Sequence, residues 1–248
     1  MNLAEHSKYF LDRLKWPSSE WTVPNALPVL FFGQIDRACV ATIGLNPSDR
    51  EYVSESGVEL TGSRRRFETL GSLGLRGRHE IDENSAERAT QRMVRYFDPS
   101  SPVYAWFRPL ERVLTGLGAS FLDGSAVHLD LVQEPTAPTW SKLRAVDPVG
   151  ADELLRRDLP FLRWQLEAFP FATLVCTSRS VLDATMELTE ASVRRTGRMA
   201  RVTWTDARGT IAGRDVRVVG WNIPLVQPTG LRAEDQARLG EAFRCANA

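Results

Sequence analysis

The stretch that decides the fold is ACVATIGLNPS, residues 38–48. Its first eight residues are almost continuously apolar, which is typical of a strand covered on both faces, and the run breaks abruptly at Asn46-Pro47. Two runs of the same kind follow, ATLVCT at 172–177 and VRVVGWNI at 216–223. Strands covered on both faces occur mainly in parallel sheets with helices on either side. The sequence therefore predicts an α/β fold.

The rest of the chain supplies alternating helices and strands. Helical patterns are expected at 85–97, 102–117, 150–169, 178–191 and 232–246, and further strands at 125–132 and 200–205. Residues 201–217 suggest a hairpin at the sheet edge. This order predicts a three-layer α/β/α sandwich with a mostly parallel central sheet. We expect a single domain over 1–248, with a helical extension at 1–37 and a long active-site loop region at 46–84, although two compact halves also fit the length.

Composition narrows the class of protein. The chain is 43% hydrophobic and 25% charged, which disfavours disorder. Its three cysteines are scattered without a metal-ligand spacing, so we expect no metal and no cofactor. No secretory signal or run of about 20 apolar residues occurs, so we expect a cytoplasmic protein with no membrane partner, and a monomer.

The charge pattern neither requires nor excludes a nucleic-acid partner. The formal net charge is zero, whereas a dedicated nucleic-acid binder usually carries a basic excess. Almost all the positive charge is arginine, whose planar donor fork suits phosphate oxygens. Arginine codon usage in a GC-rich genome explains the same bias. The arginines cluster at two places in the chain, at Arg64, Arg65 and Arg66 and at Arg194, Arg195, Arg198 and Arg201.

The ends of the predicted strands carry unusual polar residues. Ligands of open α/β sheets bind at the carboxyl ends of strands. Those ends are followed by Asn46-Pro47-Ser48, by Asp130 and by Trp221-Asn222. These positions are therefore the first candidates for a site.

Four segments in order resemble the uracil-DNA glycosylase superfamily. IGLNPS at 43–48 is similar to its first active-site motif, and RRFETLGSLG at 65–74 resembles the helix that follows it in the mismatch-specific branch. LDLVQEPT at 129–136 is similar to the central segment, and QPTGL at 227–231 to the late Asn-Pro-Ser-Gly-Leu loop. The resemblance covers about 38–245 discontinuously and implies a base-excising enzyme that acts on DNA.

The resemblance also implies a reaction. Asn46 would hold the attacking water by its side-chain oxygen, a role in orientation because asparagine is a poor general base. The four segments contain no lysine for a Schiff base, so a monofunctional glycosylase that leaves an abasic site is expected. An Asn-Pro turn that merely ends a strand is the alternative for Asn46.

Base recognition is expected from Gly44, Tyr52, Asp130 and Asn222. The family often has an asparagine where Asp130 stands. An ionised aspartate accepts from the exocyclic amine of cytosine, so Asp130 points to a cytosine-derived base, while a protonated Asp130 still permits uracil. A structural ion pair with an arginine is the alternative for Asp130, and His128 is expected to be a core histidine.

DNA contacts are expected at two loops. Arg64, Arg65 and Arg66 follow the first motif, and the late loop holds Gln227, Pro228, Thr229, Gly230 and Leu231. Leu231, or else Leu225, is the candidate wedge that fills the stack after base flipping.

Several alternatives remain open. A helix-hairpin-helix glycosylase is one alternative, but the sequence lacks the catalytic lysine or aspartate expected of that class. A nucleoside hydrolase would need no arginine-rich rim, and a non-catalytic DNA- or nucleotide-binding module would keep the fold without the reaction. DNA repair and antiviral defence against modified cytosine both fit the enzyme reading.

Overall fold

The computed structural model describes residues 3–226 and 230–244. Contacts divide the chain into two compact units. The first unit comprises residues up to Asp36, Leu45–Tyr104 and Asp130–Leu162, and the second comprises Arg37–Gly44, Ala105–Leu129 and the residues from Arg163 onward. Because each unit is assembled from three separate segments, neither corresponds to a contiguous stretch of sequence.

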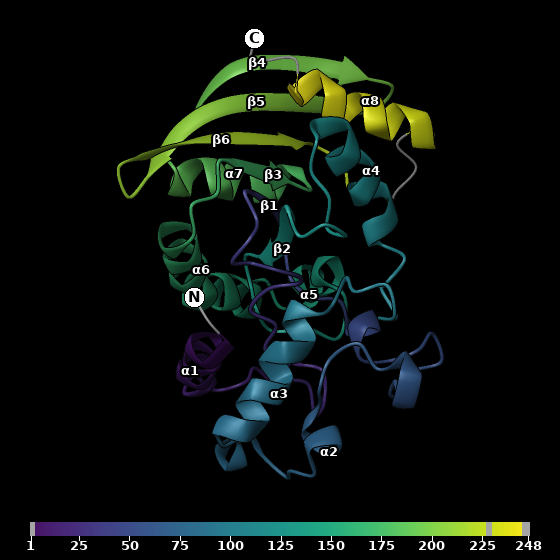
Figure 1. The fold of residues 1–248 in the computed structure, drawn as a ribbon, viewed down its shortest axis with the longest axis vertical. Coiled ribbons are helices and arrows are strands. Elements are labelled where there is room, and N and C mark those ends of the chain that lie inside the picture. Colours follow the sequence, from purple (N-terminus) through teal and green to yellow (C-terminus); the bar gives the residue numbers. More distant parts are fainter. Residues whose placement is uncertain (1–2, 227–229, 245–248) are drawn as a thin grey trace. The chain divides into compact units, whose positions relative to one another are not determined.

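A six-stranded sheet lies in the second unit (Figure 1). Only Asp130, the last residue of one edge strand, belongs to the first unit. Its strand order is β2-β1-β3-β6-β5-β4. The strands are β1 (Val40–Gly44), β2 (Ala126–Asp130), β3 (Thr173–Cys176), β4 (Ser192–Met199), β5 (Val202–Ile211) and β6 (Arg214–Trp221).

The pairing confirms an α/β fold around a mostly parallel central sheet. β1 pairs with β3 in parallel, with Val40 opposite Thr173, and β3 pairs with β6 in parallel. β5 is antiparallel to both β6 and β4. The side chains of β1 are buried along its whole length, in agreement with the continuous apolar run.

The hairpin expected within 201–217 is present, but it is not at the sheet edge. β5 and β6 pair from Trp204 to Ile211 and join through Ala212-Gly213, both with positive φ (49° and 74°). A two-residue hairpin turn with left-handed residues matches the twist of the strands. The edge is formed by β4, which the sequence did not predict because its residues are exposed and lack an apolar alternation.

Helices cover both faces of this sheet. α7 (Arg179–Leu188) packs on β3 and β6 on one face, and α8 (Ala233–Arg244) places Phe243 edge-on to Trp204 on the other. α8 also packs against α4 (Phe107–Leu117). The two helices approach closely at Gly240, where an added Cβ would lie 1.9 Å from a backbone carbonyl of α4.

The first unit is helical and loop-rich. Its helices are α1 (Leu3–Leu14), α2 (Leu70–Leu73), α3 (Glu83–Val94), α5 (Trp140–Val146) and the first part of α6 (Pro148–Ala168). α1 packs against α3. A cluster of aromatic rings forms much of the core of this unit: Phe32, Tyr52, Phe67, Tyr96 and Phe97.

Among the described residues, no helix has both the length and the apolar character needed to span a lipid bilayer.

Candidate active site

Asn46 lies two residues beyond β1, in the first unit, and its side chain is held by two hydrogen bonds. The amide nitrogen Nδ2 donates to the carbonyl of Pro47 at 3.0 Å and to Oγ1 of Thr136 at 2.9 Å. Asn46 is half-buried, whereas Thr136 is buried. The side chain is therefore held through its amide nitrogen.

The partners of Asn46 fix which way the amide faces. A carbonyl oxygen only accepts hydrogen bonds, so the atom that faces Pro47 must be the NH₂ group. Thr136 Oγ1 donates its own proton to the Pro138 carbonyl at 3.2 Å and thus accepts from Asn46. Within the described residues Oδ1 of Asn46 accepts no hydrogen bond, so it is available to a water or a ligand.

Backbone pairing brings the first-motif loop beside the central segment. The amide of Val132 donates to the carbonyl of Leu45 at 3.0 Å, and Ser48 and Thr136 form a parallel bridge. On its other side, Thr136 bridges to Thr22. Residues 132–137 are thus held between residues 21–29 and the Asn46 loop, which explains why Thr136 reaches Asn46 across 90 residues of sequence.

Glu51 is a buried acid in the same loop that the sequence did not single out. It is 2% exposed, and Oε2 accepts a hydrogen bond from Tyr96 at 2.7 Å. Burial raises the pKa of Glu51 to about 8, although the Tyr96 hydrogen bond and the Arg66 charge oppose the shift; the nearby Asp130 charge adds to it. At neutral pH this carboxyl is mostly protonated.

Asp130 and Tyr52 are both buried in the first unit, at 2% and 3% exposure. Asp130 lies near enough to Glu51 for its charge to raise the pKa of that group. Tyr52 donates its hydroxyl to the Leu27 carbonyl at 2.7 Å, and its ring stacks on Phe67. The Tyr52 ring is thus part of the core, and no open ring face is available in this arrangement.

The three arginines of the 64–66 cluster have different surroundings. Arg66 donates to the carbonyls of Pro102 and Arg50 and lies over the ring of Tyr104, so it ties the loop together. Arg65 is half-buried and lies 3.7 Å from Glu68. Arg64 is exposed and forms no ion pair within the described chain, which leaves it accessible to a phosphate.

A network of buried charged side chains contacts the central segment, residues 129–136. Glu134 and Asp158 are buried and contact Arg13, while Glu134 also binds Arg78 through two bonds of 2.8 Å. Burial alone would raise the pKa of Glu134, but the Arg78 bonds and the charges of Arg13 and Arg157 hold it below its usual value. Three arginines against two carboxylates leave this network with one positive charge.

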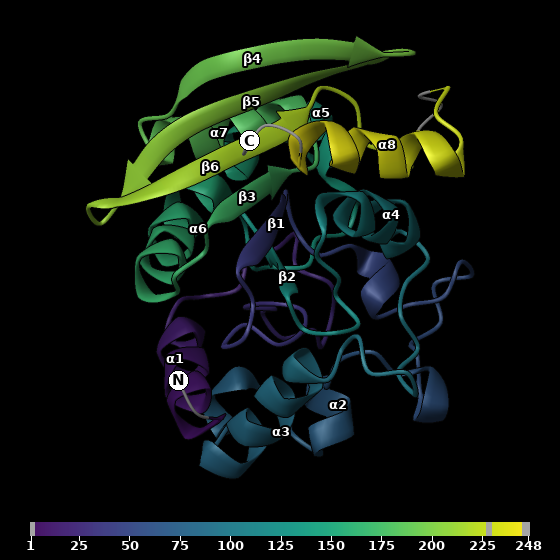
Figure 2. The same ribbon diagram turned by 45° about the horizontal axis from the view of Figure 1, so that its top comes forward.

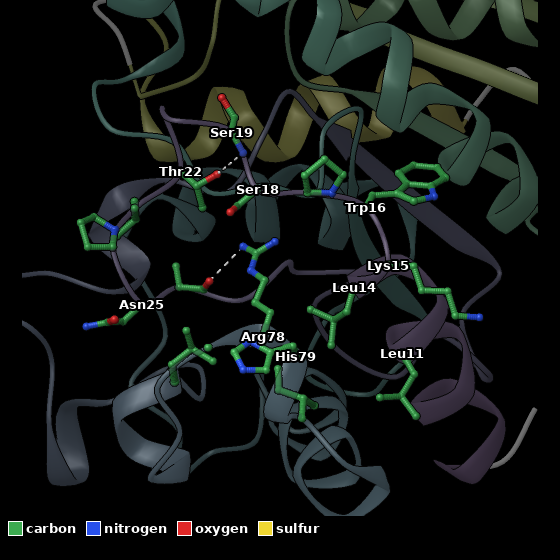
Figure 3. A pocket seen from close by; sticks show the side chains of 17 residues that line it. Leu11, Leu14, Lys15, Trp16, Ser18, Ser19, Thr22, Asn25, Arg78 and His79 are labelled. Carbon is green, nitrogen blue, oxygen red and sulfur yellow. Dashed lines mark hydrogen bonds between the residues drawn. The ribbon is translucent and has the colours of Figure 1, made fainter.

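A cavity of about 730 Å³ opens in the first unit beside this network (Figure 3). Arg78 lines it and uses three of its five donors, two on Glu134 and one on the Ala26 carbonyl at 3.0 Å. None of the residues that line the cavity is acidic, within the described part of the chain. None of the predicted site residues lines it either. The apolar part of its lining comes mainly from Leu11, Leu14, Trp16, Val23, Leu70 and Ile81.

The remaining predicted residues belong to the second unit. Gly44 is the buried last residue of β1. Asn222 follows β6, and its Oδ1 accepts a hydrogen bond from the amide of Thr203 in β5 at 2.8 Å. This bond joins the residue after β6 to the neighbouring strand. Gly230 is exposed with φ of 76°, and Leu231 is half-buried. Gln227, Pro228 and Thr229 lie outside the described residues. The convergence of these residues with Asn46 stays a prediction.

Two other residues named from the sequence also lie in the second unit. His128 is buried, 2.7 Å from Oγ1 of Thr42 and edge-on to Trp106 and Phe107, as expected of a core histidine. Leu225, the second wedge candidate, is half-buried beside Trp221 at a small apolar hollow.

Comparison with known proteins adds no assignment. A scan against protein-family models matches no family, and a search of curated proteins finds no significant relative.

Proposed function

We propose that the protein is a monofunctional DNA glycosylase, which hydrolyses the N-glycosidic bond of a flipped-out pyrimidine and leaves an abasic site. The proposal includes a uracil-DNA glycosylase-like fold, a site at the Asn46 loop, and DNA as the partner. Its basis is the ordered set of four motifs together with the geometry around Asn46.

The observation that carries the proposal is the one-sided anchoring of Asn46. Both hydrogen bonds hold Nδ2, and Oδ1 remains available. A residue that positions a water must present an acceptor in a defined direction, and Thr136 provides that constraint.

The reaction assigned to this group is a hydrolytic displacement. The bond between C1′ and the base nitrogen breaks, and its electron pair leaves with the base, while positive charge develops on the sugar. Water held by Asn46 Oδ1 forms the new bond to C1′. Its proton passes to solvent, because an amide is too weak a base to keep it, and the departing base takes up a proton from solvent.

The substrate class proposed is a cytosine-derived base, with uracil as the alternative. Asp130, when ionised, accepts from an exocyclic amine, which cytosine has and uracil lacks. A cytosine-derived substrate fits defence against DNA with modified cytosines, and a uracil substrate fits DNA repair.

The test is base release from defined DNA. Oligonucleotides that carry uracil, hydroxymethylcytosine or glucosylated hydroxymethylcytosine are incubated with wild-type protein and with Asn46→Ala, and strands are then cleaved by alkali. Asn84→Ala is the matched control, because Asn84 is exposed on α3. We expect cleavage at one of the bases with wild type and Asn84→Ala, and its loss in Asn46→Ala with DNA affinity retained.

Other outcomes would overturn the proposal. DNA binding by both forms without any base release would identify a binding module. Release of bases from free nucleosides but not from DNA would identify a nucleoside hydrolase.

A further inference from the structure

The edge strand β4 and the turn that follows it carry positive charge that carboxylates neutralise only in part. Residues 192–205, which include β4 and the start of β5, contain four arginines and no acidic residue. Arg194, Arg198 and Arg201 are exposed and form no ion pair within the described residues. Figure 2 shows β4 as the outermost strand of the sheet.

Several other exposed arginines of the second unit are paired with acidic side chains. Arg163, Arg179 and Arg238 each pair with an acidic side chain on their own helix, at 3.9, 2.9 and 3.6 Å. Arg195, the fourth arginine of the stretch, is also engaged, because it binds Asp206 at 3.0 Å and lies over Trp204. Three of the four arginines of this stretch therefore carry charge that no carboxylate of the described residues neutralises.

The local backbone spreads the three guanidinium groups along the strand. Arg194 lies at an irregularity of the β4–β5 pairing, and Arg201 lies in the two-residue turn after Met199. Arg198 donates only its Nε, to the Ala200 carbonyl at 2.9 Å, which leaves both terminal nitrogens of its fork available. A free pair of terminal nitrogens suits bidentate contact with phosphate oxygens.

We infer that this β4 arginine edge, defined as Arg194, Arg198 and Arg201, is a binding site for the phosphate backbone of DNA. The inference rests on the proposed function for the choice of DNA, and it adds a contact surface in the second unit that is separate from the Asn46 loop. Its contribution is independent of sequence, because phosphate contacts position a protein on DNA without reading bases.

The test measures how binding depends on salt. On duplex DNA each phosphate contact contributes about 0.9 to the magnitude of the negative slope of log affinity against log salt concentration, so loss of three contacts reduces that magnitude by about 2.7. Between 50 and 200 mM salt, the affinity of wild type should then fall about 40-fold more than that of the triple variant Arg194→Gln, Arg198→Gln, Arg201→Gln. The probes are duplex and single-stranded oligonucleotides with ordinary bases only.

The matched control removes the same charge from the same unit. The triple variant Arg163→Gln, Arg179→Gln, Arg238→Gln loses three exposed arginines that are already paired. The inference predicts a wild-type salt slope for this control. Equal slopes for the two triple variants would overturn the inference.

A second readout separates DNA binding from protection of an exposed strand edge. Charged residues on edge strands also prevent pairing between molecules. Light scattering that shows self-association of the β4 variant, with an unchanged salt slope for its monomer, would overturn the inference.

Base release is assayed separately, so the two proposals can fail independently. A changed salt slope without base release refutes the glycosylase but not the DNA-binding edge. Base release with an unchanged salt slope refutes the edge but not the glycosylase.

Discussion

Replacement of Glu51 by glutamine is expected to stabilise the protein increasingly as the pH rises. The carboxyl is 2% exposed and accepts a hydrogen bond from Tyr96. Glutamine has nearly the same shape, keeps an oxygen for Tyr96 and cannot ionise. The substitution therefore removes the free-energy cost of keeping a buried carboxyl protonated, with little change in packing.

The direction of the pH dependence follows from proton binding. The folded pKa of Glu51 is about 8 and the ordinary value is 4.5. Between these values the folded state keeps a proton that the unfolded state has lost, so the free energy of unfolding falls as pH rises. The stability associated with neutral Glu51 is fully present below about pH 4.5 and is lost as pH rises through about 8.

The size of the effect follows from the same two values. The cost of keeping the folded carboxyl protonated is about 1 kcal/mol at pH 5 and about 3 kcal/mol at pH 7, since each pKa unit corresponds to about 1.4 kcal/mol. The gain in free energy of unfolding that Glu51→Gln gives relative to wild type should thus be about 2 kcal/mol larger at pH 7 than at pH 5.

Urea denaturation of wild type and Glu51→Gln at both pH values measures this difference. Glu55→Gln is the matched control, because Glu55 is exposed on the same loop, and its stability should follow that of wild type. A stability difference between Glu51→Gln and wild type that did not change with pH would refute the buried, protonated state of Glu51.

Three further predictions concern positioning and packing. Thr136→Val should lower kcat on the substrate DNA by about 10- to 100-fold with little change in KM, because the Asn46 amide loses its hydrogen bond to the Thr136 hydroxyl. Thr136→Ser should restore the rate, and equal rates for both variants would contradict this role. Arg13→Gln should lower the free energy of unfolding in urea by about 3 kcal/mol, because buried Glu134 and Asp158 lose the arginine that both contact. Arg144→Gln, at an exposed pair, should cost less than about 1 kcal/mol, and similar costs for the two would contradict the buried network. Gly240→Ala should cost about 1 to 3 kcal/mol, because its Cβ would collide with the α4 backbone; an unchanged urea midpoint would show that the helices can separate freely.

The central part of the sheet could be predicted from the sequence because burial on both faces leaves a simple pattern. β1, β3 and β6 are nearly continuous apolar runs, and the structure pairs them in parallel. β4 could not be predicted in this way, since its side chains are mostly exposed. Its existence depends on pairing with β5, which a pattern of residue types does not record.

The sequence pointed to candidate site residues only at the ends of strands. Asn46 stood out because an apolar run stops there, but its partner Thr136 is 90 residues away. Glu51 resembled an ordinary charged loop residue in the sequence DRE. Its burial depends on Tyr96 and the aromatic core of the first unit, which are brought together only by the fold.

The most direct test of the central claim is to quantify free base and abasic sites in the same reaction by mass spectrometry. Wild-type protein should release one base for each abasic site formed in DNA that carries its target pyrimidine, and Asn46→Ala should release almost none under single-turnover conditions. Equal release by Asn46→Ala and wild type, or abasic sites without free base, would contradict a hydrolysis directed by the Asn46 side chain.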